Sequence, residues 1–105
     1  MIGRRSRFHD LVARQLDLFE HDEAALLVEA AEADAVWTNA ERDESEELYG
    51  DYQLVADALG ERLYDVREAY AQTLDERAAD DYRSAFTRGA TRRFPRFASL
   101  LADGV

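Results

Sequence analysis

The chain has 105 residues, among them 13 arginines, no lysine, no cysteine and 23 acidic residues, and its net charge is −10. This length suits one domain spanning residues 1–105, and an apolar content of 47% argues against disorder. The lack of cysteine excludes disulfides, thiolate metal sites and a cysteine nucleophile.

Two amphipathic segments open the chain. Residues 5–20 predict a helix because their apolar side chains recur at helical spacing, namely Phe8, Leu11, Val12, Leu16 and Phe19. The acidic stretch 20–23 interrupts this stripe, and Asp22 is a favourable N-cap for a second helix that ends near Trp37. The sequence leaves open whether these are two helices or one long, kinked helix.

The strongest pattern lies in residues 41–72, which we predict to form one long central helix. Apolar residues recur every three or four positions from Leu48 to Leu74, with an eleven-residue repeat that favours a nearly straight helix. At roughly 1.5 Å per residue the helix would be about 48 Å long. Thr38 and Glu41 match a capping box that would start it. Either the first two helices cover its stripe end to end, or a second copy of the chain covers it.

A second capping box, Thr73 with Glu76, predicts a fourth helix that begins near Asp75 and ends before Pro95. The tail 96–102 predicts a short C-terminal helix. No segment alternates with a period of two, so we expect no strands. The expected fold is all-α, an antiparallel bundle of about four helices with one long central member.

Acidic and basic residues are segregated along the chain. Between His9 and Asp81 there are 22 acids against five arginines, whereas the two ends together carry eight arginines and one acid. Such a pattern concerns partners and association rather than chemistry. The use of arginine alone suits a high-GC genome, and the acid excess suits a halophilic prokaryote with a salt-rich cytoplasm. That origin competes with any functional reading of the acidity.

The residues that carry chemistry form no recognisable constellation. Neither His9 nor His21 belongs to a Glu-x-x-His motif, and Asp17 with His21 supplies only two metal ligands. None of the serines and threonines lies in a recognisable catalytic constellation. We therefore predict a non-enzymatic protein with no cofactor and no metal site. A metal-binding bundle is the third alternative, and mimicry of nucleic acid by the acidic face ranks below it.

The arginine-rich segment 88–97 is the first candidate partner surface. Arg88 and Arg92 lie four residues apart and form a cationic ridge on the fourth helix. Beyond them arginine alternates with phenylalanine, a composition suited to acidic surfaces and stacked bases, at Arg93, Phe94, Arg96 and Phe97. The alternative is that these arginines pair with acids of this or a neighbouring chain, while the phenylalanines fill the core.

The second candidate surface is the outer side of the long helix, where Tyr49, Leu54 and Tyr64 face away from the apolar stripe. We predict a helical interaction module that binds a protein partner or a second copy of itself along this helix. Binding of nucleic acid or another polyanion through segment 88–97 ranks second. The longest nearly apolar run, residues 24–28, is too short to cross a bilayer, and no signal peptide is expected, so we predict a cytoplasmic protein without a membrane partner.

Overall fold

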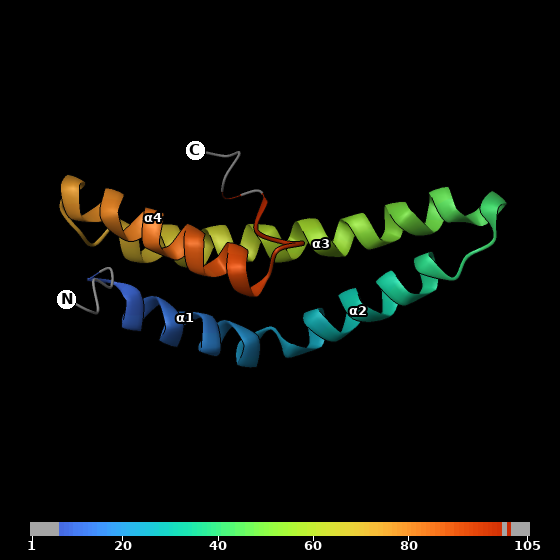
Figure 1. Ribbon diagram of the computed structural model, residues 1–105, viewed down its shortest axis with the longest axis horizontal. Coiled ribbons are helices and arrows are strands. Elements are labelled where there is room, and N and C mark those ends of the chain that lie inside the picture. Colours follow the sequence, from blue (N-terminus) through green and yellow to red (C-terminus); the bar gives the residue numbers. More distant parts are fainter. Residues whose placement is uncertain (1–6, 100, 102–105) are drawn as a thin grey trace, which may run out of the picture.

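The computed structural model describes residues 7–99 and 101, and this part of the chain contains four helices and no strand (Figure 1). The helices are α1 (His9–Asp22), α2 (Ala24–Thr38), α3 (Arg42–Ala71) and α4 (Glu76–Arg93). They form an elongated body of 52 × 27 × 23 Å. The predicted all-α bundle with one long helix is confirmed.

Helices α1 and α2 follow each other end to end along α3, so together they cover its apolar stripe (Figure 1). A single residue, Glu23, separates them, and its backbone keeps helical hydrogen bonds on both sides, to Phe19 O at 2.8 Å and from Leu27 N at 2.9 Å. The chain therefore bends here without a loop. Asp22 ends α1 and does not cap α2, which corrects the predicted boundary. The predicted start of the first helix, residue 5, lies outside the described residues.

Helix α3 matches the predicted range, and Tyr52, Leu59 and Leu63 of its stripe are buried. The predicted capping box at its start is wrong. Thr38 belongs to α2, which continues this far because the Asn39 side chain donates to Ala35 O at 2.9 Å and satisfies the end of that helix. Instead, acidic residues in the first turn of α3 stabilise its start, because their negative charges lie near the positive end of the helix dipole.

Helix α4 begins where predicted, but its cap is Asp75, whose carboxylate accepts a hydrogen bond from Ala78 N at 2.9 Å. Thr73 instead donates its hydroxyl to Tyr70 O, 2.7 Å away, at the end of α3. After α4 the chain turns at residues 95–98 and becomes helical again at Ser99 and Leu101. The rest of the predicted tail helix lies outside the described residues.

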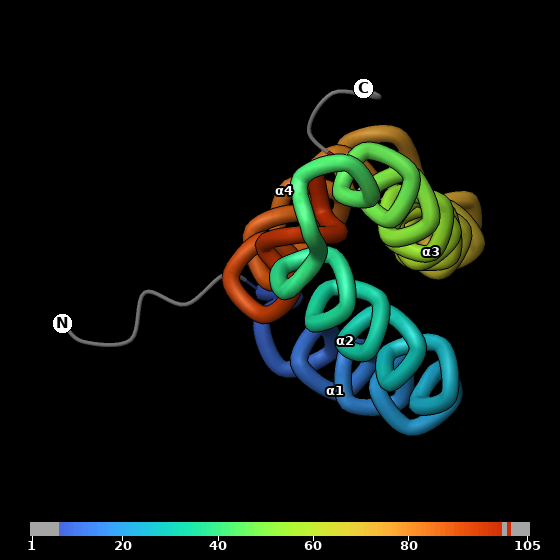
Figure 2. The backbone as a smooth tube through the Cα atoms, turned by 90° about the vertical axis from the view of Figure 1, so that its right-hand side faces the viewer, coloured from blue at the N-terminus to red at the C-terminus, as the bar shows by residue number. Residues whose placement is uncertain are grey.

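The core lies where α1, α3 and α4 pack together. Helices α1 and α4 run in the same direction and antiparallel to α3 (Figure 1), and Figure 2 shows the bundle end on. The Phe8 ring packs against Tyr82 and the Phe19 ring against Phe94. The largest fully buried side chains are Leu16, Leu59, Leu63, Tyr82, Phe86 and Leu101. The other half of the molecule is the α2–α3 hairpin, whose far end projects beyond α4 (Figure 1).

Candidate partner-binding groove

A groove of about 540 Å³ lies between α1 and α4. Its floor is apolar or small and is made by Val12, Ala13, Leu16, Ala85 and Gly89. Its rim is basic and is made by His9, Arg88, Arg92 and Arg93. Concave sites of this volume, with an apolar lining and a few polar groups, are typical of ligand and side-chain pockets.

The floor of the groove depends on Gly89, where the α4 backbone packs closely against side chains of α1. A Cβ atom at this position would lie 2.9 Å from Val12 Cγ1 and 3.3 Å from Leu16 Cδ1. Glycine therefore allows the two helices to approach, while the neighbouring Ala13 and Ala85 are too short to fill the space above them. Sequence reasoning missed the groove, because its two walls are far apart in the sequence.

The rim of the groove retains two uncompensated cations. Arg93 is neutralised because its Nη1 donates to Asp17 Oδ1 at 2.6 Å and to Glu20 Oε1 at 3.2 Å, both on α1. Arg88 and Arg92 are exposed and form no ion pair with any residue in the described part of the chain. In a protein with a large excess of acids, these two guanidinium groups remain available to an anion.

The other residues of segment 88–97 attach the tail to the body of the protein. Phe94 is buried with its ring 5.4 Å from that of Phe19, and Phe97 is half-buried. Arg96 pairs with Asp34 of α2 at 2.7 Å, and the hydrogen bond to this carboxylate raises the pKa of Arg96. Of the six residues predicted in this segment, the structure thus leaves Arg88 and Arg92 free of such contacts.

The three residues predicted on the outer side of α3 lie apart from one another. Tyr49, 44% exposed, packs its ring 4.9 Å from that of Trp37. The Tyr64 ring lies 5.2 Å from the guanidinium of Arg67. Leu54 is the most exposed of the three, at 72%. It follows Tyr49 by five residues, so at 3.6 residues per turn its side chain points about 140° away from that of Tyr49 around the helix axis. The three side chains therefore do not form one continuous patch.

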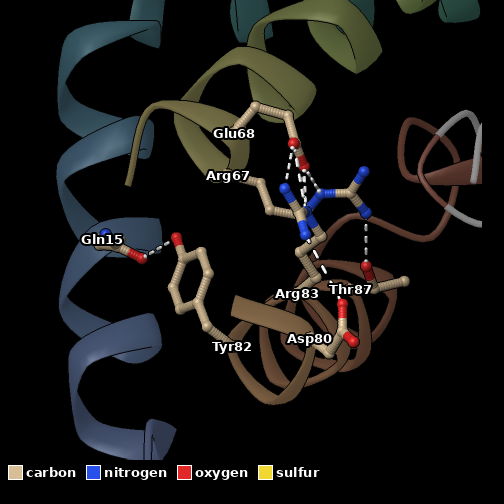
Figure 3. A network of polar contacts seen from close by, with 7 residues as sticks. All are labelled: Gln15, Arg67, Glu68, Asp80, Tyr82, Arg83 and Thr87. Atoms are coloured by element: carbon tan, nitrogen blue, oxygen red, sulfur yellow. Dashed lines mark hydrogen bonds and ion pairs between the residues drawn. The ribbon is translucent and has the colours of Figure 1, made fainter. Parts of the chain in front are cut away.

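Sequence reasoning missed a polar network that joins α3 to α4 (Figure 3). Arg67 is only 2% exposed, and it donates to Thr87 Oγ1 and to Glu68 Oε2, both at 2.9 Å. Arg83 of α4 donates to both oxygens of Glu68, and this hydrogen bonding lowers the pKa of the Glu68 carboxyl. The available sequence signal was the position of Arg67 four residues after Leu63, which places it on the apolar face of the helix. We assign this network a structural role.

Two further polar groups lie within the bundle. The Tyr82 hydroxyl donates to Gln15 Oε1 at 2.7 Å, and burial raises the pKa of Tyr82 to about 12 (Figure 3). Asp34 binds Arg96 through one oxygen, whereas its other oxygen is buried without a hydrogen-bond partner among the described residues. The negative charge of Asp34 is therefore compensated by Arg96, although one of its oxygens lacks a hydrogen bond within the described residues.

Neither metal binding nor membrane insertion receives support from the described residues. No group of three or more His, Asp or Glu side chains among them could hold a metal ion. Asp17, the predicted partner of His21, accepts a hydrogen bond from Arg93 instead. Within the same residues, none of the helices combines the length and the apolar character needed to span a bilayer.

Comparison with known proteins assigns no family. No family model matches the chain, and no curated protein or solved structure is significantly similar to it.

Proposed function

We propose that the protein is a non-enzymatic, cytoplasmic interaction module that binds an acidic protein partner in the α1–α4 groove. The observation that carries this proposal is the pair of free arginines, Arg88 and Arg92, above an apolar floor. A carboxylate can accept two parallel hydrogen bonds from a guanidinium, and such pairs are stronger than neutral hydrogen bonds. The lack of cysteine is consistent with a reducing compartment.

The apolar floor favours a protein partner over nucleic acid. An aliphatic side chain of a protein partner can contact the small and aliphatic residues of this floor, whereas a phosphate backbone gains little from them. Binding to nucleic acid relies on many phosphate contacts, and here Arg93 and Arg96 already pair with acids of the same chain. Polyanion binding through segment 88–97 therefore stays the second candidate.

Self-association along α3 also stays a prediction, with less to support it. The exposed residues on the outer side of α3 include Asp51, Asp57, Glu61 and Asp65, and Leu54 stands among them as a single aliphatic side chain. Two such surfaces would bring like charges together, which costs binding energy. We therefore assign the partner site to the groove.

Binding of a designed peptide tests this proposal. The probe is a fluorescently labelled helical peptide with leucine on one face and glutamate on the other, and the readout is fluorescence anisotropy. We expect binding that weakens as salt is added, because charge pairing steers and orients the complex. Replacing Arg88 and Arg92 together by glutamate should weaken it roughly a hundredfold, since like charges would then face each other.

The matched control is Arg14→Glu with Arg77→Glu, which makes the same change in net charge at two exposed positions outside the groove. Equal loss of affinity in both double variants would mean that net charge, and not the groove, controls binding. The proposal would also fail if an oligonucleotide bound with a steep salt dependence while the peptide did not bind.

A further inference from the structure

The far end of the α2–α3 hairpin, residues 35–48, carries an unpaired acidic surface that we call the hairpin tip. It contains a single basic residue, Arg42, and five acids, which are Glu41, Asp43, Glu44, Glu46 and Glu47. All five acids are exposed, and none forms an ion pair within the described part of the chain. Like charges this close together repel one another, so a cationic surface would be favoured beside them.

The hairpin tip also offers apolar contact area. Val36 is 54% exposed and lies at a shallow hollow of about 440 Å³, whose lining also includes Ala40 and Leu48. Glu41 and Glu44 line the same hollow. The tip thus presents aliphatic groups bordered by carboxylates, whereas the groove presents an aliphatic floor bordered by arginines.

The two surfaces lie in opposite halves of the elongated molecule. The turn between α2 and α3 forms one end, and α1 and α4 lie toward the other (Figure 1). An antiparallel pair of copies brings each tip alongside the half of its partner that contains the groove. The contact occurs twice, and a two-fold pair of this kind closes without recruiting further copies.

Building on the proposed function, we infer that the acidic partner in the groove is the hairpin tip of a second copy of this chain. The resulting dimer is held by two identical contacts, each with Arg88 and Arg92 of one copy against the tip carboxylates of the other. Charge complementarity fixes the antiparallel orientation, because a parallel pair would place tip beside tip.

Reversing the charge of each surface separately tests this inference. The groove variant carries Arg88→Glu and Arg92→Glu, and the tip variant carries Glu44→Arg and Glu47→Arg. All four side chains are exposed, and circular dichroism checks that each variant stays folded. The mass in solution is then measured by light scattering and sedimentation, at low and at high salt.

We expect the wild-type chain to have the mass of two copies at low salt and to dissociate more readily at high salt. Each variant alone should dissociate at least tenfold more readily than the wild type. In the groove variant both contacts set acid against acid, and in the tip variant the net charge of the tip changes from −4 to 0, so both contacts lose their attraction. An equimolar mixture of the two variants should recover the mass of two copies. In the mixed pair the unchanged groove meets the unchanged acidic tip, and the acidic groove meets the two arginines introduced into the other tip. If the charge reversal at the tip disturbs folding, the milder variant Glu44→Gln with Glu47→Gln replaces it and should also weaken pairing.

A wild-type protein that remains a single copy would overturn the inference, as would a mixture of the variants that does not pair. Titrating the tip variant, whose groove is intact, with the leucine–glutamate peptide separates this failure from that of the proposed function. Peptide binding without self-association leaves the proposed function standing and rejects only the second copy as partner. Absence of peptide binding to this variant rejects the proposed function itself.

Discussion

Replacing Gly50 and Gly89 by alanine should change stability in opposite directions. Both residues lie inside helices, where alanine is favoured over glycine by about 1 kcal/mol. A Cβ atom at Gly50 would have nothing within 4 Å, so the whole of this gain is available. A Cβ atom at Gly89 would meet Val12 Cγ1 at 2.9 Å, which is closer than two carbon atoms tolerate.

The magnitudes follow from these contacts. Gly50→Ala should raise the free energy of unfolding by about 0.5–1 kcal/mol. At Gly89 the same gain is opposed by overpacking, which costs roughly 1–3 kcal/mol, because β-branched Val12 is stiff at χ1 and cannot swing away. The net effect of Gly89→Ala should be a loss of up to about 2 kcal/mol.

Urea unfolding and thermal melts of the two variants measure this difference. For Gly50→Ala the melting temperature should rise by about 2–8 °C, while for Gly89→Ala it should fall. Combining Gly89→Ala with Val12→Ala should cost less than the sum of the two single changes, since the smaller side chain at position 12 removes the clash. An equal increase in stability at both glycines would refute the close approach of α1 and α4 at the floor of the groove.

Two further predictions concern the polar contacts. The pKa of Glu68 is held below its ordinary value of 4.5 by its hydrogen bond to Arg83, so the carboxylate stabilises the fold at neutral pH and this contribution is lost as the pH falls below that value. Glu68→Gln should therefore lower the free energy of unfolding by about 1.5–3 kcal/mol near neutral pH. It should also reduce the loss of stability in acid, which urea midpoints across the acid range measure. An unchanged pH dependence of these midpoints would contradict the prediction. Asp75→Ala should cost about 1 kcal/mol in the same assay through loss of the α4 cap, whereas Thr38→Ala should change stability by less than about 0.5 kcal/mol. A larger loss at Thr38 than at Asp75 would show that the caps are misassigned.

The sequence determined the helices because their signals are local. Apolar side chains at helical spacing can be recognised without knowledge of what they pack against, and the limits of α3 and α4 follow from their stripes and from Pro95. Capping was less certain, since a serine, threonine or aspartate near a helix end can serve either the helix before it or the one after it. Thr38 and Thr73 both belong to the preceding helix or its end, and Asp75 alone caps the following one.

Only the tertiary structure decided which arginines remain free. The four arginines of segment 88–97 look alike in the sequence. The packing of α1 against α4 brings Asp17 beside Arg93, and the packing of the tail brings Asp34 beside Arg96. An ion pair between residues so distant in the chain depends on helix placement to within a few ångströms, and no periodicity encodes that placement. The same holds for the groove, which exists because Gly89 allows two helices, separated by most of the sequence, to meet.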